Sequence, residues 1–195
     1  MQTENLSPKE SIDLIQGMIN KTKNAVADSS VFFLLWGWVV FAACILQYIL
    51  KNVAHYQYHY YAWVLIIIGI AGSVYLGIQK GKTIKVKTYI GESIEQLWIS
   101  IGITYFALAF IFIKIGYQNA FTFYILLYGI GCFVTGRLIK FSPLVWGGIG
   151  AWLLAVVSAY LDYDTNILIS ALAILISYII PGYLLRIKYK RTVIN

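Results

Sequence analysis

The chain has 195 residues, of which 60% are hydrophobic and only 12% are charged, and its mean hydropathy is +0.75. Because soluble domains are usually about 45–50% apolar and about 25% charged, this composition excludes an ordinary soluble domain and predicts an integral membrane protein. The formal net charge of +7 comes from Lys and Arg residues that flank apolar runs without a nucleic-acid recognition motif, so nucleic acid is not expected as a partner.

Residues 1–30 are polar and predict a cytoplasmic amphipathic helix. They lack the basic start, short apolar core and small-residue cleavage site of a signal peptide. Ile12, Ile15 and Ile19 begin a 3-4-3-4 spacing of apolar residues, so one face of this helix requires a packing partner. We expect that face to pack on the protein's own cytoplasmic loops; a partner helix or the membrane surface are the alternatives.

The remaining residues, 31–195, predict an all-α transmembrane bundle of six spans arranged as three hairpins. A span needs about 20 apolar residues to cross roughly 30 Å of hydrocarbon, so six spans use almost the whole segment. The predicted spans are residues 31–51, 60–79, 95–114, 120–137, 143–161 and 166–185.

Basic residues set the orientation of these spans. The segment KGKTIKVK, residues 80–87, places four lysines between two apolar runs and cannot enter a bilayer. Of the 15 Lys and Arg residues, only Lys51 and Lys114 fall on the side opposite to this segment. Because cytoplasmic loops carry an excess of Lys and Arg, both termini are predicted to be cytoplasmic.

Small residues recur every fourth position on two of the spans. Inside lipid, such stripes are where helix backbones approach closely. We expect both stripes to pack inside the bundle, with a contact between copies of the chain as the alternative. The residues concerned are Gly69, Ser73 and Gly77 on the second span and Gly147, Ala151 and Ala155 on the fifth.

A weak internal repeat accompanies these stripes. Residues 69–80 and 129–140 align at an offset of 60, and Trp36, Trp98 and Trp146 open successive odd spans. Some transporters are built from parallel repeated units, and this pattern would relate the three predicted hairpins in that way.

Pro181 and Gly182 predict a kink in the sixth span, about one turn before its cytoplasmic end. Proline removes an intrahelical hydrogen bond and its ring clashes with the carbonyl of Ser177. Nearby groups, including the hydroxyl of Ser177, can satisfy the exposed backbone. We expect a structural kink; a movable cytoplasmic gate is the alternative.

Chemically active side chains are scarce. No ionisable residue lies deep in a span, which argues against an enzyme and against a proton relay, and no cofactor is expected. His55, His59, Asp162 and Asp164 form a weak candidate metal site at the outer side. We expect instead a solvated rim in which Asp164 or Thr165 caps the sixth span.

Four segments carry a resemblance to a known group of proteins: SIDLIQGMINKTK, FLLWGWVV, GRLIKFSPLVWGG and YIIPGYLLRIK. With them, nearly the whole chain resembles six-helix inner-membrane proteins of Bacteroidota that have no assigned activity. The resemblance implies a bacterial inner membrane as the location, and it implies no catalytic residue.

Two functional hypotheses follow. The favoured one is a membrane regulator or scaffold that presents Ile12, Ile15 and Ile19, together with Lys82 and Lys85, to a cytosolic protein. The alternative is a transporter or channel for a small, mostly uncharged or aromatic solute, with a path among the small-residue stripes.

Overall fold

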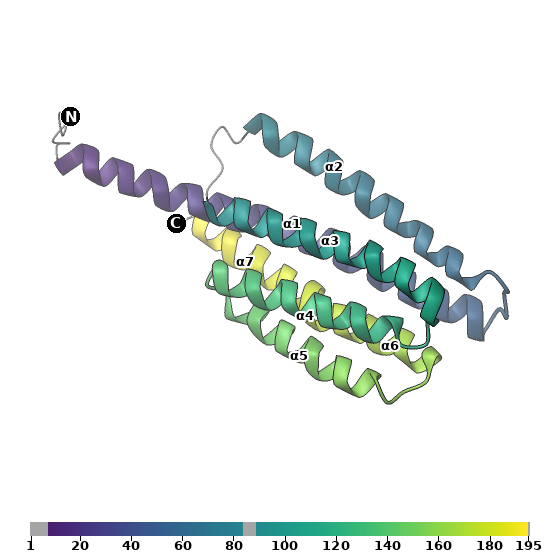
Figure 1. The fold of residues 1–195 in the computed structure, drawn as a ribbon. Helices are drawn as coiled ribbons and strands as arrows, with labels where there is room; N and C mark the ends of the chain where they lie inside the picture. Colours follow the sequence, from purple (N-terminus) through teal and green to yellow (C-terminus); the bar gives the residue numbers. More distant parts are fainter. Residues whose placement is uncertain (1–7, 84–88, 195) are drawn as a thin grey trace.

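The computed structural model describes the backbone of residues 8–83 and 89–194 and the side chains of residues 30–79 and 89–188. Every described element is a helix, which confirms the predicted all-α class (Figure 1). In chain order the elements are α1 (Pro8–Asn52), the 3₁₀ helix η1 (His59–Val64), α2 (Leu65–Thr83), α3 (Tyr89–Ile115), α4 (Ala120–Leu138), α5 (Ser142–Ser158), α6 (Tyr163–Ile174), the π-helical segment η2 (Leu175–Ile179) and α7 (Ile180–Ile194).

Five segments within the described ranges are long and apolar enough to cross a membrane. The sixth, α5, is also apolar but has only 17 residues, which is at the lower limit of about 17–25 residues for a span. The six helices therefore match the number of predicted spans. The five longer segments are Ser30–Asn52, His59–Gln79, Tyr89–Ile115, Ala120–Leu138 and Tyr163–Lys188.

Helix α1 is continuous for 45 residues, and residue 30, the predicted domain boundary, lies inside it. At 1.5 Å per residue it is about 68 Å long, more than twice the thickness of the hydrocarbon layer. Figure 1 shows its first turns, in purple, running past the rest of the bundle with no other described helix beside them. The segment Ser30–Asn52 is the part that packs into the bundle.

The core lies between α4, α5, the second half of α1 and the chain from α6 to α7. The most extensive contacts are between α4 and α5. Ala151 and Ala155 are buried, and a Cβ atom added to Gly147 would lie 3.0 Å from the Ile176 carbonyl oxygen. The fifth-span stripe therefore lies inside the bundle, where its small side chains let α5 approach its neighbours.

Helix α2 lies at the edge and packs mainly on α1. Added Cβ atoms at Gly69 and Gly72 would lie 3.2 Å from the Trp36 ring and 3.0 Å from the Leu35 side chain. A Cβ atom at Gly77, in contrast, would meet no described atom within 4 Å. The prediction that Gly77 packs inside the bundle is therefore wrong for the single chain, because α2 diverges from α1 towards its C-terminal end (Figure 1).

A tryptophan contact recurs at an offset of 62 residues. The Trp36 indole lies over Gly69 and donates to Ser73 Oγ at 2.9 Å. Sixty-two residues later, the Trp98 indole lies over Gly131 and donates to Thr135 Oγ1 at 3.2 Å. These contacts pair α1 with α2 and α3 with α4 in the same way. Trp146 is 69% exposed, so it makes no equivalent buried contact.

The sixth span contains the π-helical segment η2, which ends two residues before Pro181. Because proline has no N–H group, the Ser177 carbonyl loses its usual α-helical donor. Cys132 on α4 donates its thiol to that carbonyl at 3.3 Å, whereas the Ser177 hydroxyl donates to the Ala173 carbonyl. π-helical segments are one of the recognised causes of helix bending. A movable gate at Pro181 and Gly182 stays a prediction.

Candidate functional site

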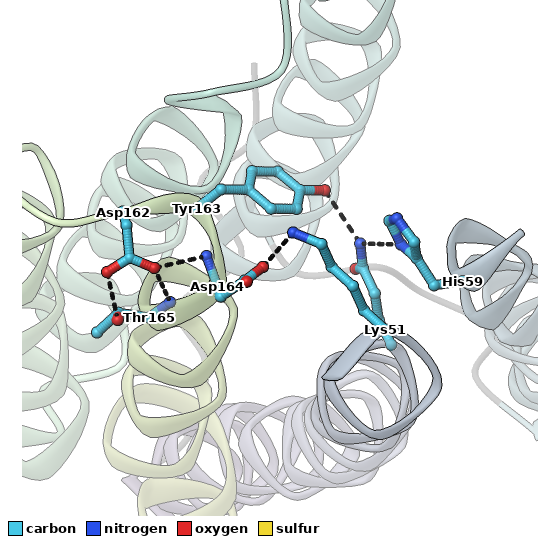
Figure 2. A network of polar contacts seen from close by, with 7 residues as sticks. Lys51, His59, Asp162, Tyr163, Asp164 and Thr165 are labelled. Carbon is cyan, nitrogen blue, oxygen red and sulfur yellow. Dashed lines mark hydrogen bonds and ion pairs between the residues drawn. The ribbon is translucent and has the colours of Figure 1, made fainter. Parts of the chain in front are cut away.

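Among the described side chains, the densest set of polar contacts lies where α1 ends and α6 begins, which we call the Lys51 end of the bundle (Figure 2). Three chain segments meet there: the last turns of α1, the helix η1 and the first turn of α6. We call the connected side chains the Gln47 network: Gln47, Lys51, His59, Trp63, Tyr163 and Asp164.

Gln47 is the centre of this network and is only 1% exposed. Its Nε2 atom donates to the Tyr163 hydroxyl at 3.0 Å and lies 3.4 Å from Nδ1 of His59. Its Oε1 atom accepts from Trp63 Nε1 at 2.7 Å. The amide thus uses both its donor and its acceptor groups, which is the condition for burying such a group at low cost.

Aromatic rings support the amide from the side of α4. Phe121 is buried, and its ring centroid lies 6.0 Å from that of Trp63 and 5.5 Å from that of Tyr163. Because both hydrogen-bonding rings contact the same α4 residue, the positions of η1 and α6 are coupled through Phe121 as well as through Gln47.

Lys51 extends the network towards solvent. It forms an ion pair with Asp164, and its ammonium lies 4.7 Å from the centre of the Tyr163 ring (Figure 2). The two charged side chains are 31% and 36% exposed. Exposed ion pairs contribute only about 0–1 kcal/mol, so the stabilising part of the network is the buried amide.

Asp162 caps α6. Its carboxylate accepts from the backbone N–H groups of Asp164 and Thr165 and from the Thr165 hydroxyl at 2.7 Å (Figure 2). These bonds, first of all the one from the Thr165 hydroxyl, lower the pKa of Asp162. The prediction that Asp164 or Thr165 caps this helix is wrong, because Asp164 is used by Lys51 and Asp162 stands at the cap position.

The four weak metal candidates do not gather around one point. His55 lies in the segment between α1 and η1, with φ of 49°, and His59 faces Gln47. Asp162 is bound to the α6 backbone and Asp164 to Lys51. Among the described side chains, those of residues 30–79 and 89–188, no group of three or more His, Cys, Asp or Glu could hold a metal ion.

Sequence reasoning missed the central residue of this site. Gln47 lies within an apolar helix, and the search for polar function in the spans considered only ionisable side chains. A buried amide in such a helix also needs partners, because an unpaired one costs roughly 1–3 kcal/mol. That cost was the signal that could have identified Gln47, although not its partners.

The predicted cytosolic residues lie at the other side of the molecule. Ile12, Ile15 and Ile19 fall in the projecting part of α1, whose backbone alone is described, and Lys82 falls in the last turn of α2. Lys85 lies outside the described residues. The Gln47 network and the projecting part of α1 are therefore separated by the length of the first span.

Comparison with known proteins finds no protein family, curated protein or solved structure that matches this chain. The resemblance to six-helix inner-membrane proteins of Bacteroidota stays a prediction. The function must therefore be argued from the geometry.

Proposed function

We propose that this chain is a six-span protein of a bacterial inner membrane, with both termini in the cytoplasm, that holds a cytosolic protein partner on the projecting part of α1. The observation that carries the proposal is the continuity of α1 from Pro8 to Asn52. Only the last 23 residues of this helix, Ser30–Asn52, are needed for a span. The preceding residues extend the same rigid axis by about 33 Å.

Continuity supports one of the three arrangements open to the apolar face. A helix lying flat on the membrane, or folded back on the bundle, requires a change of direction near residue 30, whereas a helix that continues through residue 30 favours projection away from the bundle (Figure 1). At 100° per residue, Ile12, Ile15 and Ile19 fall within about 60° of one another around the axis. A projecting helix with such a stripe is typical of a helix that binds in an apolar groove of a partner.

Photo-crosslinking tests this proposal. We expect a benzophenone amino acid at Ile15 to give one specific cytosolic adduct in cells. The same amino acid at Asp13 or Asn24, which lie on the opposite side of α1 from Ile15 at 100° per residue, should give that adduct at about a tenth of the yield or less. Equal adducts from both sides, or none at Ile15, would contradict a partner bound by this face.

Cysteine labelling tests the orientation. Tyr89 and Tyr160 are 84% and 87% exposed and lie at opposite ends of the helices, while the native Cys44 and Cys132 are fully buried and give little background. With a membrane-impermeant maleimide on sealed cells, we expect Tyr160→Cys to react and Tyr89→Cys to react only after lysis. Reaction of both variants in intact cells would disprove the topology.

The transporter alternative has less support from the packing. Its path was expected among the small residues of the second and fifth spans. Ala151 and Ala155 are at most 1% exposed, and Gly147 has the η2 backbone against it. Small residues at these positions serve close helix packing, which leaves the projecting helix as the better-supported feature.

A further inference from the structure

A layer of buried polar side chains lies between α4, α5 and α6, one helical turn away from an apolar layer. Ile125, Ala155 and Ala173 form part of one buried apolar cluster, so these positions of the three helices face each other. Moving three residues towards the Lys51 end on each helix reaches Thr122, Ser158 and Ser170. The next turn of α6 adds Asn166. We call Thr122, Ser158, Asn166 and Ser170 the polar layer.

Hydrogen bonds support this register. The hydroxyls of Thr122 and Ser158 lie 2.6 Å apart, which joins α4 to α5 at this level. Asn166 Nδ2 donates to the Leu161 carbonyl at 3.3 Å, which holds the amide against the turn that follows α5. The four side chains are at most 8% exposed, and Ser158 and Asn166 are at 0%.

Two atoms of the layer have no hydrogen-bond partner among the described residues: Asn166 Oδ1 and Ser170 Oγ. Because Asn166 and Ser170 are four residues apart, they lie on the same face of α6. An unpaired buried polar group costs free energy, and Asn166 and Ser170, at 0% and 4% exposure, are shielded from surrounding water by the protein itself. Two such groups on one face therefore point to a bound molecule.

The chemistry of the layer defines what it binds. The layer holds no charged side chain, and the partial positive charge at the N-terminal ends of α4 and α6 is opposed by the partial negative charge at the C-terminal end of α5, so no net charge there balances an ion. The free lone pairs of Asn166 Oδ1 disfavour an anion. A buried water typically makes two to four bonds to such groups. We propose that the polar layer binds a small neutral hydroxyl-bearing molecule, either water or a small polyol, that donates to Asn166 Oδ1 and bonds Ser170 Oγ.

The variant Ser170→Ala tests the proposal through the sign of its effect on Tm. If the site is dry, removing an unpaired hydroxyl relieves a penalty and alanine is the better helix former, so Tm stays or rises. If a molecule is bound there, the variant removes one of its partners and we expect Tm to fall by about 2–4 °C. Ser100→Ala, which removes an exposed hydroxyl bonded to the Leu97 carbonyl, is the matched control.

A glycerol titration distinguishes the two sources. The general effect of glycerol on stability cancels in the Tm difference between wild type and Ser170→Ala. A bound polyol makes this difference grow with glycerol and then saturate, while bound water gives a difference that is present without glycerol and does not change. A Ser170→Ala protein at least as stable as wild type at every glycerol concentration would overturn the proposal.

Discussion

Gly148→Ala is expected to destabilise the protein by about 3 kcal/mol, the upper end of the range for overpacking. An alanine Cβ at this position would lie 2.8 Å from both the Gly129 carbonyl oxygen and the Phe133 backbone nitrogen. Both are backbone atoms of α4, so no side-chain rotation relieves the contact. The α4–α5 pair, which makes the most extensive helix contact of the bundle, would have to separate.

Thermal unfolding in lipid nanodiscs measures this effect, with an expected fall in Tm of about 6–12 °C. Gly150→Ala, two residues along the same helix, is the control. Its added Cβ would meet only the Ile176 side chain, at an ordinary 3.4 Å. Since alanine is favoured over glycine in a helix by up to about 1 kcal/mol, this control should be neutral or stabilising. Equal Tm values for the two variants would contradict the packing described.

The sequence predicts the number and place of the helices well. The fourth span was expected at residues 120–137 and α4 covers Ala120–Leu138. Apolar runs of this length, separated by basic or polar residues, have few alternatives to helices because the backbone must satisfy its own hydrogen bonds in an apolar setting. Hydropathy, however, does not determine where a helix breaks. Residue 30 marks a change from polar to apolar composition, and α1 continues through it.

The four-residue spacing of small residues also does not show whether a stripe is packed inside the bundle or exposed. Gly69, Ser73 and Gly77 have the same four-residue period, but only the first two contact Trp36. Whether a stripe is covered depends on how the two helices cross, and that is a property of both helices rather than of one sequence pattern. The Trp98 contact with Gly131 shows the same limit, because the sequence alignment at offset 60 paired Gly69 with Gly129 instead.

The Gln47 network could not be predicted as a unit because its members are far apart in the chain. Gln47 and Tyr163 are separated by 116 residues, and their contact depends on α1 packing beside α6. The distribution of basic residues predicts that Lys51 and Asp164 lie on the same side of the membrane. It does not predict that they form an ion pair. The sequence predicts at which end of the bundle a residue lies, whereas the packing of the helices determines which residues it contacts.

Gln47→Leu is expected to destabilise the protein by about 2–4 kcal/mol. Leucine has a similar volume, so the core stays filled, but Trp63 Nε1 and the Tyr163 hydroxyl lose the group that now pairs with them. A fully buried polar group left without a partner costs about 1–3 kcal/mol, and the Trp63 and Tyr163 side chains are half-buried, so each is expected in the lower part of that range. Gln79→Leu is the control: the Gln79 amide donates to the Tyr75 hydroxyl at 2.6 Å, but both side chains are exposed on α2, so this change should stay within about 0.5 kcal/mol.

A double-mutant cycle shows whether the loss comes from the hydrogen bonds. Trp63→Phe keeps an aromatic ring against Phe121 but removes the N–H group that Gln47 accepts. In that background Gln47→Leu leaves one fewer group unpaired, so we expect its cost to fall by about 1 kcal/mol or more, measured by thermal unfolding of all four proteins. Strictly additive effects would show that Gln47 acts by packing alone, and that α1, η1 and α6 are not joined through its amide.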